Sequence, residues 1–142
     1  MQETAIQSVE TVRAFMQEYF DAWERGNEEE ILEYYSDDVT MSLPIGTLEG
    51  KQAVRETFVG PFNIAFPGNV HEVQNLLYQD GVVAVEWRFK AEHRGVLSGI
   101  SPTGRKVDVP GCSFYFLRDK TITRGHIYFN FPTLLEQIGA GS

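Results

Sequence analysis

The spacing of apolar residues in the first third of the chain predicts helices. From Ile6 to Trp23 these residues recur every three or four positions, which places them on one face of a long helix. Gly26 is suited to end it, because glycine readily adopts the left-handed conformation that closes a helix. Asn27, followed three residues later by Glu30, has the spacing of an N-cap and predicts a second, short helix.

The next segment mixes helix and strand signals. The second helix is predicted to run to residues 36–38, and residues 39–43 alternate as a strand. A turn-rich connection then leads into a third helix that carries Val54 and Phe58. Pro61 is expected to end this helix, because proline cannot donate the backbone hydrogen bond of a helix interior.

The second half of the chain predicts four long antiparallel strands. Asp80-Gly81 is a strong hairpin signal, and Asp119-Lys120 is a second tight turn. Pro110-Gly111 lies within the third of these strands and predicts a bulge or a bend. Pro132 opens a short terminal helix. The strands are expected at 70–79, 82–93, 106–118 and from Thr121 onward.

Early helices followed by long strands indicate one α+β domain over residues 1–142. The expected architecture is a strongly curved, mostly antiparallel sheet wrapped around the long N-terminal helix. Such a sheet forms a cone with an internal pocket, which suits a small apolar molecule.

Composition limits the expected binding partners and the expected cellular location of the protein. The chain is 42% hydrophobic and 13% aromatic, which is typical of a globular protein. Its formal charge of −8 disfavours binding to nucleic acid. Cys112 is the single cysteine, so we expect no intrachain disulfide, and neither a signal peptide nor a membrane span is visible. We therefore predict a cytoplasmic protein that does not associate with membranes.

The last strand carries the candidate chemistry. Its alternation places Arg124, His126, Tyr128 and Asn130 on one face. His126 and Asn130 are about 13 Å apart in an extended strand, so they could bracket one bound molecule. The three histidines of the chain lack the spacing of metal ligands, and we expect no metal site.

Several segments together resemble the SnoaL-like polyketide cyclases, within the nuclear transport factor 2-like or cystatin-like cone superfamily. The resemblance covers nearly the whole chain and rests on the order of four segments: YFDAWERGNEEEILEYYSDDVTM, GKQAVRETF, PTGRKV and TITRGHIYFNFPTLLEQIG. It implies the cone fold, a homodimer through the outer face of the sheet, and catalysis without a cofactor.

The resemblance also implies a general acid and base in the last strand, where SnoaL-like enzymes use an aspartate. Asn130 stands at that position in this chain, and an amide does not titrate near neutral pH. His126 stands where relatives commonly carry tryptophan. We therefore expect His126 to move the proton and Asn130 to hold a substrate carbonyl or stabilise its negative charge. A structural histidine at position 126, with the acid lost, is the alternative.

Aromatic residues are the candidates for the pocket walls, and their alternative role is ordinary packing. His93 ends an apolar strand face and resembles a histidine of the family, so it is expected near the pocket mouth. The sequence leaves open which face of residues 112–116 points inward. No role is predicted for His71. The predicted substrate-binding residues are Tyr19, Trp23, Trp87, His93, Phe114, Phe116 and Tyr128.

The predicted function is a cofactor-independent enzyme that acts on a small apolar carbonyl compound, polyketide-like or terpenoid-like. The reaction would be an acid–base cyclisation, isomerisation or rearrangement. The first alternative is a non-catalytic protein that binds a small ligand in the same pocket. The second is a hydrolase similar to limonene epoxide hydrolases. Glu86 and Arg88 have the reverse order of the pair used there, and a surface or dimer-interface ion pair is favoured for them.

Overall fold

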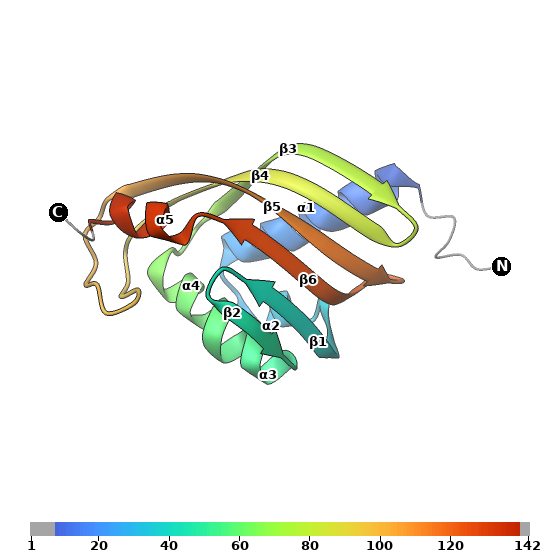
Figure 1. Ribbon diagram of the computed structural model, residues 1–142, viewed down its shortest axis with the longest axis horizontal. Coiled ribbons are helices and arrows are strands. Elements are labelled where there is room, and N and C mark those ends of the chain that lie inside the picture. Colours follow the sequence, from blue (N-terminus) through green and yellow to red (C-terminus); the bar gives the residue numbers. More distant parts are fainter. Residues whose placement is uncertain (1–7, 140–142) are drawn as a thin grey trace.

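The structure is a computed structural model that describes residues 8–139, so the predicted helical residue Ile6 lies outside the described residues. Figure 1 shows the arrangement of its elements. In chain order they are α1 (Val9–Arg25), α2 (Glu28–Leu32), β1 (Tyr35–Leu43), β2 (Gly46–Glu49), α3 (Lys51–Val54), the π-helix η2 (Arg55–Val59), α4 (Gly60–Ala65), β3 (Val70–Gln79), β4 (Val82–Glu92), β5 (Lys106–Arg118), β6 (Thr121–Phe129) and α5 (Phe131–Gln137).

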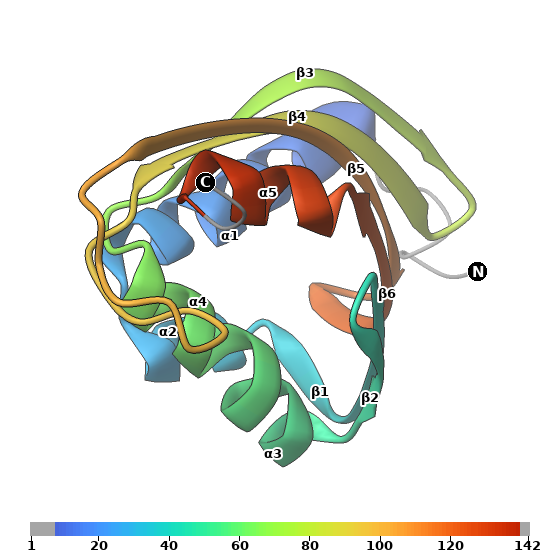
Figure 2. The ribbon, with the colours of Figure 1, turned by 60° about the vertical axis from the view of Figure 1, so that its left-hand side comes forward.

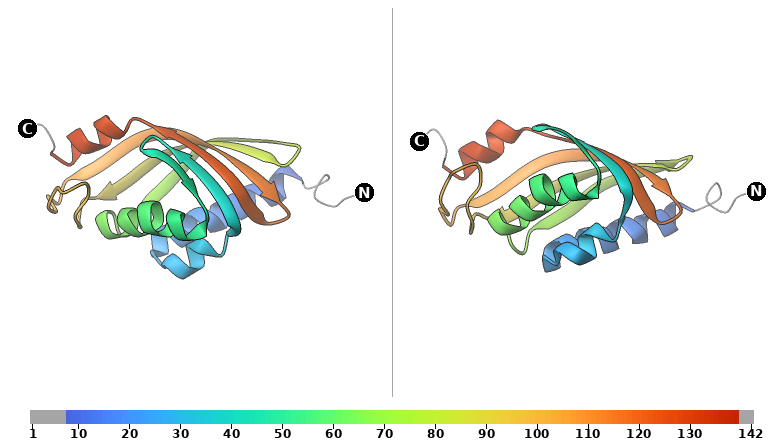
Figure 3. Two further views of the ribbon diagram at one scale, coloured as in Figure 1. Left: turned by 60° about the horizontal axis from the view of Figure 1, so that its bottom comes forward. Right: turned by 90° about the horizontal axis from the view of Figure 1, so that it is seen from below.

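Six strands form one sheet in the order β2-β1-β6-β5-β4-β3. All neighbouring strands are antiparallel except β1 and β6, which are parallel. The long helix α1 and the segment from α3 to α4 lie on the same face of this sheet (Figures 2 and 3). The predicted α+β class is confirmed. A strong curl of the sheet into a cone stays a prediction.

The first helix forms where the apolar spacing predicts it. The Ser8 hydroxyl accepts a hydrogen bond from the backbone of Thr11, and Gly26 closes the helix with a φ of 77°. Its buried face packs against the sheet. This face consists of Val12, Phe15, Met16, Tyr19, Phe20, Ala22 and Trp23.

The second helix begins as predicted but is shorter. The Asn27 side chain caps it by accepting a hydrogen bond from the backbone of Glu30. The helix ends at Leu32, and β1 begins at Tyr35 rather than near residue 39. Tyr35 is buried and pairs with Ile122 of β6, so tertiary pairing extends the strand into a segment predicted to be helical.

The third helical segment continues past Pro61, contrary to the prediction. A π-helical turn precedes it, in which the Gly60 N–H donates to the Arg55 carbonyl five residues earlier. The α-helical pattern then restarts at Gly60, which places Pro61 in a first turn, where a backbone N–H has no partner in the helix. The segment therefore extends to Ala65 and brings Phe58 and Phe62 over the sheet.

Of the bulge or bend predicted at Pro110-Gly111, the bulge is absent, because β4 and β5 pair without a shift from Val82–Phe116 to Glu92–Lys106. This continuous register resolves the orientation of β5. Ser113 and Tyr115 are buried on the inner face, whereas Phe114 faces outward. Glycine at position 111 allows close packing, because a Cβ there would collide with the ring of Trp87 and lie 2.8 Å from the Tyr128 carbonyl oxygen.

We expect Gly111→Ala to destabilise the fold by about 1–3 kcal/mol, because Trp87 and the neighbouring strand would have to move. The measurement is the free energy of unfolding from denaturant titration. Pro110→Ala is the matched control, since Pro110 is exposed and adjacent, and its effect should stay within about 0.5 kcal/mol. Equal stabilities of the two variants would contradict the close packing at Gly111.

Candidate functional site

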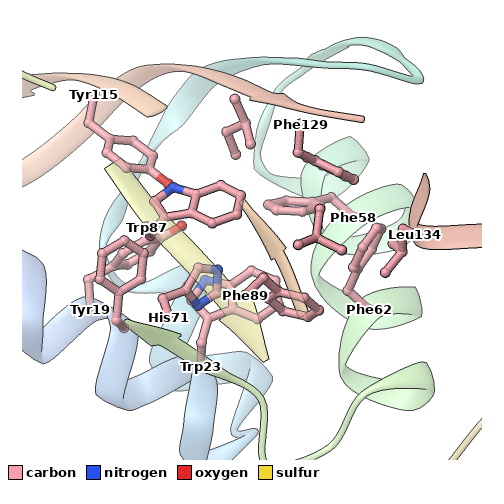
Figure 4. A pocket seen from close by; sticks show the side chains of 13 residues that line it. Tyr19, Trp23, Phe58, Phe62, His71, Trp87, Phe89, Tyr115, Phe129 and Leu134 are labelled. Atoms are coloured by element: carbon pink, nitrogen blue, oxygen red, sulfur yellow. The ribbon is translucent and has the colours of Figure 1, made fainter. Parts of the chain in front are cut away.

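A small cavity lies between α1, the α3–α4 segment and the inner face of the sheet, and α5 closes one end (Figure 4). Its volume of about 40 Å³ leaves room for a few water molecules at most. Almost the entire wall is aromatic or aliphatic. The lining residues are Tyr19, Phe20, Trp23, Phe58, Phe62, His71, Trp87, Phe89, Val109, Tyr115, Ile127, Phe129 and Leu134.

His71 of β3 places an imidazole in this apolar wall. Its ring stacks on Phe20 with centroids 4.5 Å apart, and Trp87 and Phe89 meet it edge-on at 5.2 Å. Desolvation by these neighbours lowers the pKa of His71 to about 3, so the ring is neutral at pH 7. Its Nδ1 atom is buried and has no hydrogen-bond partner among the described residues.

Two tyrosine hydroxyls form a hydrogen bond with each other near the same cavity. The hydroxyl oxygens of Tyr19 from α1 and Tyr35 from β1 are 2.5 Å apart. The ring of Tyr115 from β5 meets Tyr19 edge-on at 5.6 Å. Burial raises the pKa of all three tyrosines above the usual value of 10, so their hydroxyls stay protonated and can donate hydrogen bonds.

Trp87 of β4 completes the polar lining. Its indole N–H donates to the hydroxyl of the buried Ser113, 3.0 Å away. The bond fixes the indole plane, and the plane forms a flat wall of the cavity (Figure 4). Among residues 8–139, no carboxylate and no basic side chain other than His71 lines this cavity.

The structure brings three of the predicted substrate-binding residues into the cavity. Tyr19, Trp23 and Trp87 all line it. They come from the inward faces of α1 and β4, where the helical and the alternating patterns agree with burial.

The two predicted catalytic residues do not line the cavity. His126 lies on the outer face of β6, where its ring meets Phe116 edge-on at 5.3 Å. Asn130 is the N-cap of α5, and its side-chain oxygen accepts a hydrogen bond from the Thr133 backbone at 3.0 Å. The reason is the alternation of β6, which directs Ile127 and Phe129 inward and therefore turns the polar set outward.

Four predicted substrate-binding residues also lie outside the cavity. Phe114, Phe116 and Tyr128 belong to the outward faces of β5 and β6, and Phe114 and Tyr128 are exposed. His93 is fully buried but belongs to the start of the loop after β4. Its Nδ1 accepts a hydrogen bond from the Thr103 backbone, so its ring secures this loop.

His71 is the functional candidate that the sequence prediction missed. Pairing between β3 and β4 shifts between Val73 and Asn75. His71 and Val73 therefore face inward before the shift, and Leu76 faces inward after it. The inward positions of β3 are odd-numbered before the shift and even-numbered after it. This change in the apolar pattern is the signal that could have identified the bulge.

Within residues 8–139 no group of three His, Cys, Asp or Glu side chains is placed to hold a metal ion. In the same range no helix is long and apolar enough to cross a bilayer.

The fold is similar to several solved structures. AclR from Streptomyces galilaeus, provisionally assigned as a hydroxylase, is 23% identical over 93% of this chain and 83% of its own, with a TM-score of 0.80. A provisionally assigned SnoaL-like polyketide cyclase from Jannaschia sp. CCS1 is 20% identical over 100% of this chain and 98% of its own, also with a TM-score of 0.80. IdmH from Streptomyces antibioticus, provisionally a polyketide cyclase, is 20% identical over 90% of this chain and 98% of its own, with a TM-score of 0.72.

At these identities the likeness establishes the fold and leaves the reaction open. Comparison with the curated proteins finds no match. Residues 16–125 match the family described as the SnoaL-like domain, which covers most of the sequence and agrees with the solved structures. The chain therefore belongs to the family of SnoaL-like domains.

Proposed function

We propose that this protein acts on a small, largely apolar carbonyl compound, polyketide-like or terpenoid-like, by acid–base chemistry without a cofactor. Its site would be the aromatic cavity, and the sheet and helices would enclose this cavity as a cone. The observation that carries the proposal is the unpartnered imidazole nitrogen of His71 within an otherwise apolar wall. A buried polar atom without a partner costs about 1–3 kcal/mol, and a polar group of the ligand would remove that cost.

His71 takes the role that the sequence suggested for His126. Its neutral ring offers an acceptor lone pair, as a general base requires. In this mechanism the ring removes a proton from the carbon next to the carbonyl group. The Tyr19 hydroxyl, which burial keeps protonated, donates a hydrogen bond to the enolate oxygen.

The reaction is completed when the enolate carbon attacks a second carbonyl group and forms the ring bond. The imidazolium of His71 then returns its proton to the new alkoxide. In an isomerisation the same proton returns to another carbon. The low pKa of His71 makes it a weak base in the empty cavity, so the mechanism depends on the carbonyl group being polarised by Tyr19.

This proposal predicts proton exchange in a simple ketone. Wild-type protein should accelerate exchange of the C1 protons of 2-tetralone for deuterium in D2O, followed by NMR. His71→Phe keeps the aromatic stack on Phe20 but should lower the protein-dependent rate at least 100-fold, within the range that a positioned base contributes. His126→Ala is the control and should retain the wild-type rate, because His126 lies on the outer face.

A non-catalytic ligand-binding protein is the second candidate, and the absence of a carboxylate from the cavity wall favours it. Both tryptophans of the chain line the cavity, so ligand binding can be followed by quenching of their fluorescence. Quenching by 2-tetralone without accelerated exchange would identify a binding protein. Exchange that persists in His71→Phe would remove His71 from the mechanism.

The low pKa of His71 also predicts a pH dependence of stability. Its folded-state pKa of about 3 lies below the unfolded value near 6.5, so the unfolded chain takes up the proton first as pH falls. This group should therefore lower the free energy of unfolding by up to about 1.4 kcal/mol per pH unit as the pH falls from 6 to 4.5. Denaturant titrations of wild type and His71→Phe measure it, and the variant should lack this part of the slope.

Phe20→Leu is the matched control for this pH dependence. It removes the ring that stacks on His71 but keeps the imidazole, so it should lower stability at every pH while the slope remains. Parallel curves for wild type and His71→Phe would show that the imidazole is not held neutral by the fold.

We also propose that the protein forms a homodimer through the outer face of the sheet. Register aligns Leu77, Ala84 and Phe114 across β3, β4 and β5 on this face. Leu77 is 73% exposed and Phe114 39%, which makes an apolar patch on an acidic protein. A second copy fits because two such patches would bury each other while their charged surroundings remain in water.

Phe114→Asp should convert the dimer to a monomer, because it would place a carboxylate at the centre of the buried patch. Sedimentation velocity at about 100 µM measures the oligomeric state. Ile64→Asp is the control, since Ile64 is 62% exposed on α4, away from this face. This variant should remain dimeric. A wild-type protein that sediments as a monomer would contradict the proposal.

A further inference from the structure

The cavity shares two residues with a groove on the surface. This groove lies where the ends of β1 and β6 separate, and its volume is about 540 Å³. Ile127 and Phe129 line both the groove and the cavity. The groove is lined by Ser42, Leu43, Pro44, Ile127, Tyr128, Phe129 and Asn130.

Strand pairing explains why the groove is there. The parallel pairing between β1 and β6 ends at Ser42 and His126. The chain then turns through Pro44 into β2, whereas β6 continues to Phe129. The last residues of β6 therefore have no neighbouring strand on the β1 side, and a gap remains at the edge of the cavity.

Phe129 is the aromatic residue that lines both spaces, so its ring is the candidate partition between them. It is half-buried, and its centroid lies 6.5 Å from Phe62, 6.4 Å from Trp87 and 6.1 Å from Phe131. These separations are at the long end of aromatic contacts, so the ring is held less closely than His71 on Phe20, at 4.5 Å. Rotation of Phe129 would join the cavity to the groove.

Among the described residues, no charged side chain lines this groove. The groove beside β4 and β5 is lined by Lys90, Arg94 and other charged residues, whereas this one contains none. Its polar groups are hydroxyls and one amide. The side-chain oxygen of Asn130 caps α5, which leaves the amide N–H bonds of Asn130 as donors at the groove. Such groups suit a carbonyl or hydroxyl oxygen of a neutral molecule.

We propose that this groove is the entrance of the cavity and holds the polar end of an elongated, uncharged ligand, whose apolar end displaces the ring of Phe129. The proposal rests on the proposed function, because it takes the cavity as the ligand site. It deepens that function by giving the ligand a shape, a charge and a direction of approach.

Blocking the groove reversibly tests the entrance. In a Cys112→Ser background, Pro44→Cys is modified with benzyl methanethiosulfonate, and association of the neutral dye N-phenyl-1-naphthylamine is measured by stopped-flow fluorescence. Pro44 is exposed at the groove, so the added ring should lower the association rate constant at least tenfold. Dithiothreitol removes the ring and should restore the rate. Thr47→Cys, exposed on the same hairpin but outside the groove, is the matched control and should change less than twofold.

Two further measurements test the partition and the charge. Phe129→Ala should raise the association rate constant at least tenfold, because the cavity and the groove then form one space. The dye 1-anilinonaphthalene-8-sulfonate has the same rings with a negative charge and should bind at least tenfold more weakly than the neutral dye.

Unchanged association after modification of Pro44→Cys would overturn the entrance, even where the dye binds the cavity and quenches its tryptophans. An unchanged rate in Phe129→Ala would overturn the partition, and equal affinity for the sulfonated dye would overturn the uncharged ligand class. Absence of binding of both the dye and 2-tetralone to the unmodified protein is a different result, since it removes the cavity as a ligand site and the proposed function with it.

Discussion

Aromatic packing between α1 and the inner face of the sheet is the interaction on which this structure depends. Tyr19 alone meets the rings of Phe20, Tyr34, Tyr35 and Tyr115 at centroid distances of 5.4 to 5.9 Å. Buried aromatic side chains contribute about 1.5–3 kcal/mol each through burial, and well-oriented pairs contribute about 0.5–1.5 kcal/mol more. The rings that build the core also build the cavity wall, so the shape of the site and the stability of the fold are set by the same contacts.

Local signals allowed most of the fold to be predicted from the sequence. The apolar spacing of α1, the cap at Gly26 and the turn at Asp80-Gly81 act over a few residues, and each is found where expected. The parallel pairing of β1 with β6 joins distant segments and has no local signal. The prediction at Pro61 was wrong because a π-helical turn precedes it, and no residue type predicts such a turn. The π-turn places Pro61 in the first turn of α4, where no backbone N–H is required.

The prediction of the candidate site depended on which face of each strand points inward. One extra residue in a strand reverses that assignment. In β6 both faces were described correctly, but the polar face was assigned to the cavity, although a sheet covered by helices on one side turns its polar face to water. In β3 the bulge near Asn75 reverses the face, so counting back from Leu76 places His71 on the wrong side. The resemblance to SnoaL-like enzymes favoured the same assignment, because it places the catalytic position at Asn130, which here caps a helix.

The small volume of the cavity has a consequence for selectivity. A volume of about 40 Å³ is far below the roughly 300–1,000 Å³ of most ligand sites, so a ligand must displace side chains before it can bind. Displacing a half-buried ring such as Phe129 costs on the order of 1–2 kcal/mol of apolar burial, which lowers the apparent affinity about tenfold. A ligand that covers less apolar surface than the ring exposes gains no net affinity, whereas a larger ligand regains the loss in proportion to the area that it covers. A small aromatic cavity of this kind therefore selects by size before any hydrogen bond to His71 or Asn130 is made.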